Sequence, residues 1–184
     1  MVGGLSRDYL LGRKLGDYDF ATDATPEEMS LFLPSFDGTF ARFGAVRTRV
    51  LSSHCDITTL REEGEYKDHR HPSFIKYVKD PALDSIRRDF TVNALYIDSE
   101  YHVLDFHNGK KDLERKLLRF IGDPYKRIQE DPLRIIRAER FEKTLGFQIE
   151  KESQRAIDEL RSLLSTVSKG KKEEEIAKGW KGQK

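Results

Sequence analysis

Two aspartates separated by a single tyrosine, Asp17 and Asp19, are the residues whose type and spacing first suggest chemistry. On a strand, both carboxylates would point to one face, because successive side chains alternate between the two faces. Two carboxylates that close favour a hard divalent cation, since neither stays ionised cheaply without a positive partner. Taken alone, the motif fits a turn followed by a solvated strand residue better than a metal site.

The surrounding sequence strengthens the metal interpretation. The segment GGLSR, residues 3–7, would place glycine amides and Arg7 near a helix N-terminus, an arrangement that can hold phosphate oxygens. A third carboxylate, Asp56 in CDITTLR, lies on an expected strand and could complete the site from beside the first pair. Three acids with a glycine turn and an arginine predict a nucleoside triphosphate held by magnesium.

A polar line runs along the segment EDPLRIIRAER, where charged residues recur every three positions: Asp131, Arg134, Arg137 and Arg140. An aspartate offers acceptors and an arginine offers a planar fork of donors, so Asp131 and Arg134 could pair with the edge of a nucleobase. The alternative is a solvated helix with salt bridges to Glu130 and Glu139. The residues alone favour that alternative.

Composition narrows the class of protein. Lys and Arg total 33 against 32 Asp and Glu, so attraction to an anionic partner must come from local basic patches. The single cysteine, Cys55, excludes an internal disulfide and predicts a reducing, cytoplasmic environment. No apolar run approaches the roughly 20 residues that span a bilayer, so no membrane association is expected. No zinc site is predicted. The spacing of the candidate ligands is not typical of a tetrahedral zinc site, and these ligands are His54, Cys55, His69 and His71.

The elements that must position these residues can be read from local patterns. A short helix should start at the glycine pair, with Leu5 and Tyr9 on one face, and DYDFAT should form a strand. A second helix should follow Thr25 as N-cap and Pro26 as first helical residue, so Asp23 is taken as part of the turn before it. Three further strands are expected at 44–52, 55–61 and 73–78. A polar loop at 62–71 would separate the second of them from the third.

Beyond residue 84 the pattern becomes helical, interrupted by a hairpin at 93–106 with its turn near residues 98–101. Apolar residues at helical spacing predict a helix that ends at Gly146, and another helix is expected at 151–164. The charged residues after 166 are expected to be poorly packed, and Trp180 there suggests a partner or further sequence.

Five segments resemble, in order and approximate spacing, the bacterial CCA-adding tRNA nucleotidyltransferases of the DNA polymerase beta-like superfamily and their sister bacterial poly(A) polymerases. The resemblance covers residues 2–164 and lies in VGGLSRDYLLG, DYDFATDATPEE, CDITTLR, RRDFTVNAL and EDPLRIIRAERF. It implies an α+β fold: a polymerase-beta-like head with a small mixed or antiparallel sheet and flanking helices, then an all-helical neck. The implied division is a catalytic head at 1–120, a nucleotide-selecting neck at 121–165 and the start of a missing body domain at 166–184.

The resemblance also implies roles for single residues of the head. Gly4 and Arg7 would contact the incoming ATP or CTP, and Asp17 and Asp19 would bind magnesium. Asp56 would be the third acid near the primer hydroxyl, although the family often has glutamate there.

Further roles fall on RRDFTVNAL and on the neck. Arg88 would hold phosphate or sugar, with Asn93 supporting that turn; the alternative for Arg88 is a surface ion pair with Asp84. Base selection by protein side chains would fall to Asp131 and Arg134. The remaining neck arginines would lie near the phosphates or the contact between helix and head: Arg137 and Arg140.

The activity implied is template-independent addition of CCA to the 3' end of tRNA from CTP and ATP, by two-metal phosphoryl transfer. The polar loop at 62–71 matches the loop that the family links to switching from C to A addition, and its full length favours complete CCA addition or adenylation. Two alternatives remain: a poly(A) polymerase, and a nucleotide- or RNA-binding piece without turnover. Family members are much longer, so we expect a fragment that keeps nucleotide binding and loses most tRNA affinity.

Overall fold

Three short strands form the sheet that carries the predicted acids. The computed structural model describes residues 1–65 and 72–181, and its main sheet contains β1 (Tyr18–Thr22), β2 (Ala45–Val50) and β3 (Ser53–Thr59) in the order β1-β3-β2. β1 runs parallel to β3 and β2 antiparallel to it, so the sheet is mixed, as the resemblance implied. Along β2, Val46 and Thr48 are buried while Arg47 and Arg49 are exposed, as expected of a strand with one covered face.

Two predicted helices flank this sheet. α1 (Gly3–Leu10) begins at the glycine pair, and α2 (Pro26–Ser30) begins after Thr25. The predicted N-cap is confirmed: the Thr25 hydroxyl accepts from the Glu28 amide, and the Glu28 carboxylate accepts from the Thr25 amide. α2 is shorter than the sequence pattern suggested, and Leu31 just beyond it is 85% exposed.

Smaller hairpins complete the head. β4 (Arg61–Glu63) pairs with β5 (Ile75–Tyr77), so the polar segment predicted as a loop begins in a strand, and its residues 66–71 lie outside the described part. The helix α3 (Pro81–Ile86) follows. The hairpin expected at 93–106 is confirmed as β6 (Leu95–Ile97) and β7 (Val103–Asp105).

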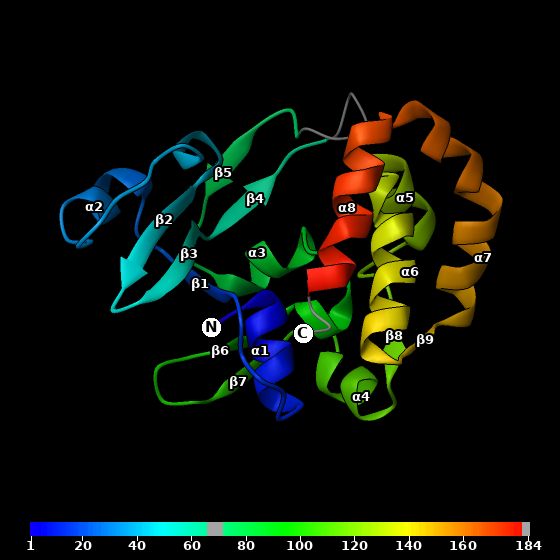
Figure 1. Ribbon diagram of the computed structural model, residues 1–184, viewed down its shortest axis with the longest axis horizontal. Helices are drawn as coiled ribbons and strands as arrows, with labels where there is room; N and C mark the ends of the chain where they lie inside the picture. Colours follow the sequence, from blue (N-terminus) through cyan, green and yellow to red (C-terminus); the bar gives the residue numbers. More distant parts are fainter. Residues whose placement is uncertain (66–71, 182–184) are drawn as a thin grey trace.

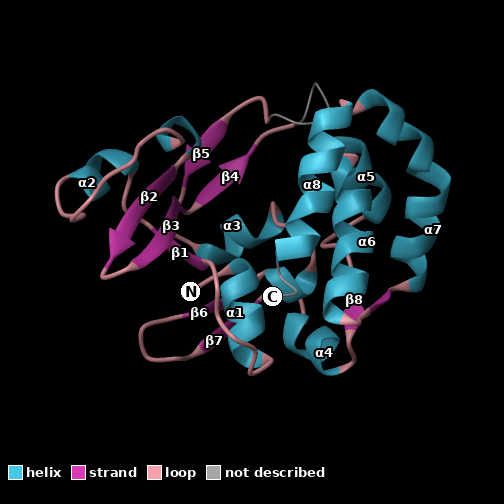
Figure 2. Ribbon diagram, in the orientation of Figure 1, coloured by secondary structure: helices cyan, strands magenta, loops and turns pink. Residues whose placement is uncertain are grey.

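The second half of the chain is mostly helical, and its helices stand beside the strands of the head in Figures 1 and 2. In chain order it contains α4 (Gly109–Glu114), β8 (Leu117–Leu118), α5 (Pro124–Glu130), α6 (Leu133–Leu145), β9 (Gln148–Ile149), α7 (Lys151–Leu160) and α8 (Lys169–Lys181). A 3-10 helix at Arg161–Thr166 separates α7 from α8. The helix expected at 151–164 is therefore α-helical only as far as Leu160 and continues as a 3-10 helix. No helix within residues 1–65 and 72–181 is long and apolar enough to cross a membrane.

One hydrophobic core joins the last part of the head to the neck helices. Phe90 is fully buried, with its ring centroid 4.8 Å from that of Phe120 and 5.8 Å from that of Phe141 on α6. Ile128 of α5 and Ile135 of α6 belong to the same cluster. Because burying such a side chain stabilises a fold by about 2 kcal/mol, this cluster fixes α5 and α6 against the segment that follows α3.

Two expectations for the helical half are wrong in detail. The polar line from Asp131 to Arg140 does not lie on one helix, because Asp131 is extended (φ −149°, ψ 100°) and α6 begins only after Pro132. A residue before proline is sterically pushed out of the helical region, which explains the break. The charged segment after 166 is also not loosely packed up to residue 181: it forms α8, which contacts α6 and buries Glu175.

Candidate active site

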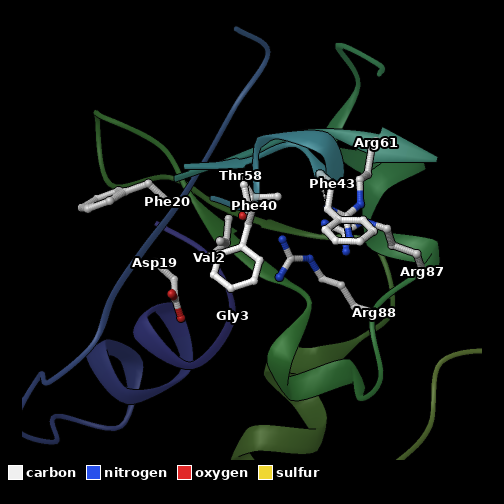
Figure 3. A pocket seen from close by; sticks show the side chains of 11 residues that line it. Val2, Gly3, Asp19, Phe20, Phe40, Phe43, Thr58, Arg61, Arg87 and Arg88 are labelled. Carbon is white, nitrogen blue, oxygen red and sulfur yellow. Dashed lines mark hydrogen bonds between the residues drawn. The ribbon is translucent and has the colours of Figure 1, made fainter. Parts of the chain in front are cut away.

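A cavity of about 320 Å³ opens between β1, the start of α1 and the segment after α3. Figure 3 shows the Arg88 guanidinium pointing into this space, with Asp19 on another element across from it. Gly3, Arg87 and Phe40 also line it. Its volume falls at the lower end of the usual range for small-molecule sites, about 300 to 1,000 Å³.

The predicted acids come together on neighbouring strands. Asp19 on β1 is the register partner of Asp56 on β3, and Asp17 lies just before β1. Burial, followed by the charges of Asp56 and Asp17, raises the pKa of Asp19 to about 6. Within the described part of the chain, no side chain donates a hydrogen bond to the Asp19 carboxylate, whereas Asp56 accepts one from Arg47.

A divalent cation suits this donor set because it would offset the mutual repulsion of the acids. The chemistry of the residues therefore fits magnesium, with Asp17 and Asp19 as the carboxylates that would hold it. Across residues 1–65 and 72–181, no three acidic, histidine or cysteine side chains already converge on a metal position. Asp56 instead accepts a hydrogen bond from Arg47 Nε at 2.8 Å, from the opposite side of β3.

The glycine pair forms one wall of the cavity. Gly3 has a φ of +64°, a conformation that favours glycine, and a Cβ there would lie 3.8 Å from Asp19 Oδ2 and 3.7 Å from Arg88 Nη1. Gly4 lies against Arg7, because a Cβ at Gly4 would be 3.5 Å from Arg7 Nη2. The predicted glycine turn therefore lies beside both Asp19 and Arg88.

Arg7 lies behind that turn and is only 6% exposed. Its Nη1 donates to Asn93 Oδ1 at 2.7 Å, and its Nε and Nη2 donate to the two carboxylate oxygens of Asp8. In this arrangement Arg7 fixes the glycine turn from within.

Arg88 forms the ion pair with Asp84 that the alternative predicted, although this pair is not at the surface. Its Nη2 lies 3.1 Å from Asp84 Oδ2, which is the ion pair of the alternative, yet the side chain is 14% exposed and lines the cavity. Asp84 also accepts from Arg87 Nε at 2.9 Å and from the Tyr96 hydroxyl. This carboxylate is 1% exposed and holds both cavity arginines in place.

The neck arginines are engaged with acids rather than with the cavity. Arg134 is buried, and its Nη1 donates to Arg127 O at 2.6 Å and to Glu130 Oε2 at 2.8 Å. The Asp131 carboxylate accepts from the Leu133 amide at 3.0 Å. Between the two residues proposed to read a base, the Arg134 amide donates to Asp131 O at 3.0 Å.

Arg137 and Arg140 converge on Glu175 of α8. Arg140 Nη2 lies 2.9 Å from Glu175 Oε1, and Arg137 Nη1 lies 3.4 Å from the same oxygen. Arg137 also donates through Nε to Asp89 Oδ2 at 2.9 Å, and Asp89 in turn accepts from Asn93 Nδ2. A chain of buried polar contacts therefore runs from Arg7 beneath the glycine turn to α8.

Several residues of this site were not identified from sequence. Asp89 and Glu175 were missed because their partners lie far away in the sequence, and Asp84 was considered only as a surface partner of Arg88. Arg47 could have been found, because it alternates with buried residues in GAVRTRV and so faces the same side as the acids.

The chain belongs to the poly(A) polymerase head domain family, whose pattern matches residues 1–119. It is 40% identical to the CCA-adding enzyme of Bacillus pumilus over 183 residues, which is 99% of this chain and 46% of that protein.

Solved structures agree with this family assignment. The crystal structure of the Bacillus stearothermophilus CCA-adding enzyme in complex with CTP matches 97% of this chain and 43% of its own length, with a TM-score of 0.88 and 32% identity. A tRNA nucleotidyltransferase complexed with a primer tRNA and an incoming ATP analog matches 96% of this chain and 51% of its own, with a TM-score of 0.77 and 27% identity. The chain spans about half the length of the relatives it matches.

Proposed function

We propose that this chain is the catalytic head and neck of a template-independent nucleotidyltransferase that adds CCA to the 3' end of tRNA from CTP and ATP. The observation that carries the proposal is the cavity in which Asp19 faces Arg88 beside the Gly3 turn. The similarity to CCA-adding enzymes supports the choice of reaction. The head would extend over residues 1–120, the neck over 121–165, and we expect the protein to work in the cytoplasm.

The residues of the head would divide the work of binding and orientation. Arg88 would hold a phosphate or the sugar of the incoming nucleotide at the cavity wall, and the amides after Gly3 and Gly4 would receive phosphate oxygens. Asp17 and Asp19 would hold magnesium, which when bound would neutralise phosphate charge and lower the barrier to attack on the α-phosphate. Asp56, beside Asp19 on the next strand, would orient the 3' hydroxyl of the primer.

The neck would select the nucleotide. Asp131 and Arg134 offer the acceptors and donors that the edge of cytosine or adenine requires. Arg137 and Arg140 lie about one and two turns further along α6. If a phosphate replaced their carboxylate partner Glu175, both guanidinium groups could donate to the phosphate. The backbone of the cavity arginines is tied to this neck, because Arg127 Nη2 donates to Arg87 O and Arg88 O at 2.6 and 2.7 Å.

The test is incorporation of labelled CTP and ATP into a tRNA that lacks its terminal CCA, in the presence of Mg²⁺. The wild-type chain should add the missing nucleotides, and Asp19→Asn should lower the rate at least about a hundredfold, since metal binding contributes several kcal/mol to the barrier. Asp23→Asn is the matched control, because this exposed aspartate lies in the turn before α2 and should leave the rate unchanged.

Three outcomes would contradict the proposal in different ways. A long A tail in place of CCA would identify a poly(A) polymerase. Binding of CTP without any incorporation by the wild-type chain would identify a nucleotide-binding piece. Equal rates for Asp19→Asn and the wild type would show that the acids on β1 are not the metal site.

A further inference from the structure

A basic pair on β2 adjoins the acid proposed to face the primer hydroxyl. Arg47 is the antiparallel register partner of Asp56, and Asp56 is the parallel register partner of Asp19, so the three side chains lie in one row across the sheet. Arg49 follows two residues along the same exposed face of β2, roughly 7 Å away for a strand. Arg47 and Arg49 are called the β2 arginines below.

The backbone of Arg47 is held by hydrogen bonds, while part of its guanidinium group is open to solvent. Its backbone exchanges two hydrogen bonds with Asp37, of 2.9 and 3.0 Å, and pairs with β3 on the other side. Its Nε donates to Asp56 Oδ1, while neither Nη atom donates to any residue among 1–65 and 72–181. The side chain is 54% exposed, so a guanidinium edge is presented to solvent directly beside Asp56.

Arg49 repeats this arrangement one step further from the cavity. Its Nη2 lies 2.9 Å from the Nε2 of His54, the residue opposite it on β3. The two arginines thus form a short basic row that starts at the acids and runs toward the β2–β3 turn. The whole chain carries a formal net charge of only +1, so its overall charge attracts an anionic polymer weakly. A local row of two arginines would supply that attraction instead.

We infer that the β2 arginines bind backbone phosphates at the 3' end of the RNA primer, and that Arg47 also acts as a positioning residue for Asp56. The inference rests on the proposed function, because Asp56 marks where the primer hydroxyl would lie. An arginine fork can serve a carboxylate through one nitrogen and a phosphate through the others. Side chains spaced two residues apart on a strand match successive phosphates of an extended single strand.

The experiment measures binding of a short RNA hairpin that mimics a tRNA acceptor stem with a single-stranded 3' end terminating in CC, without nucleotide, across a series of salt concentrations. The full chain is compared with Arg47→Gln, Arg49→Gln and the double variant. Each lost phosphate contact should reduce the slope of log K against log salt by about 0.7, which is about a fivefold loss of affinity at 0.1 M salt. Arg47→Lys should recover most of the affinity, because it restores the charge.

Arg161→Gln is the matched control, since Arg161 is a similarly exposed arginine that pairs with Glu139 in the neck. It should leave the salt slope and the melting temperature unchanged. CTP affinity, measured in parallel, should fall less than RNA affinity in the β2 variants. Wild-type slopes in both single variants, or equal losses of CTP and RNA affinity, would overturn the inference.

Incorporation of CTP by the same proteins separates this inference from the proposed function. A wild-type chain that binds RNA through the β2 arginines but incorporates nothing would contradict the proposed activity and leave the RNA contact standing. A wild-type chain that incorporates CTP, with β2 variants that match it in RNA affinity, would contradict only the RNA contact.

Discussion

Asp84 is the buried carboxylate on which the cavity wall depends. It accepts hydrogen bonds from Arg87, Arg88 and Tyr96, and its Oδ1 also accepts from the Arg61 amide at 3.0 Å. Burial opposes its charge, but the two adjacent guanidinium groups keep the pKa of Asp84 below its ordinary value. A buried acid with this many donors orders the arginines that would meet a phosphate.

Replacing Asp84 by asparagine should therefore weaken both the fold and the site. Removing the charge leaves two buried arginines without their shared partner, and such losses cost about 3 to 5 kcal/mol. We expect a lower free energy of unfolding in urea and weaker CTP binding. Glu62→Gln is the control, since its carboxylate lies 3.7 Å from Lys76 Nζ at the surface and should change stability by less than about 0.5 kcal/mol. Equal effects of the two variants would contradict this role.

Gly3 offers a second test at the residue scale. Gly3→Ala places a side chain at a φ of +64°, which costs about 1 kcal/mol, and puts a methyl group 3.7 Å from Arg88 Nη1 in the cavity wall. Gly12→Ala carries the same backbone strain, at a φ of +63°, with open space around its Cβ. Both should lose similar stability by thermal unfolding, while only Gly3→Ala should bind CTP more weakly. A matching loss of CTP affinity in both would remove Gly3 from the site.

At the scale of elements, charged contacts join α8 to α6. Glu175 is its buried acid, 4% exposed, and accepts from Arg137, Arg140 and Lys178. Ile176 beside it is 50% exposed. The helix thus packs through one carboxylate facing two arginines of α6.

Glu175→Gln should loosen α8 selectively. The glutamine keeps an acceptor but loses the charge that Arg137 and Arg140 share, and because both arginines are only partly buried we expect a loss of about 2 kcal/mol in stability. Amide hydrogen exchange in α8 should speed up more than exchange in β1 or β3. Glu174→Gln, on the exposed face of the same helix, should have little effect on either measurement. Unchanged exchange in α8 of the Glu175 variant would show that other contacts hold the helix.

At the scale of the whole molecule, head and neck are joined by polar pairs around a shared core. Asp89 follows the cavity arginines in the chain and is bound by Arg137 of α6. Phe141 of α6 lies under three guanidinium groups, with its ring centroid 5.2 Å from Arg7 Cζ, 5.7 Å from Arg137 Cζ and 4.1 Å from Arg140 Cζ. Loss of the ion pair between Asp89 and Arg137 should therefore lower the stability of both the head and the neck.

The Asp89 pair predicts a pH dependence of stability. Burial would raise the pKa of Asp89, but the Arg137 charge and hydrogen bonds outweigh it and lower the pKa to about 2. A lowered folded-state pKa means that the stabilisation, about 2 kcal/mol, is complete above about pH 4 and is lost as the pH falls toward 2. Urea unfolding of the wild type should therefore weaken between pH 4 and 2.5 more than that of Asp89→Asn.

The control for this measurement is Asp158→Asn, at an exposed position on α7. It should follow the wild-type pH curve, because removing it leaves the Asp89 pair intact. An Asp89→Asn protein with the same acid sensitivity as the wild type would show that this pair does not link pH to stability.

Local rules of the chain determined much of this protein. The N-cap at Thr25, the alternation along β2 and the hairpin at 93–106 follow from interactions within a few residues, so the sequence alone predicts them. The two acids flanking Tyr18 were singled out by their spacing, but only the neighbouring glycine pair, Arg7 and Asp56 favoured a metal site over a turn.

Only the tertiary structure decided which charges meet. Arg137 pairs with Asp89 across 48 positions of the chain, and Arg7 with Asn93 across 86, which no local pattern specifies. A long flexible side chain can reach many partners, and packing of the core around Phe90 selects among them. The sequence by itself therefore determined the strands and turns that carry the acids, while packing decided the arginine partners that shape the cavity and fasten the neck to it.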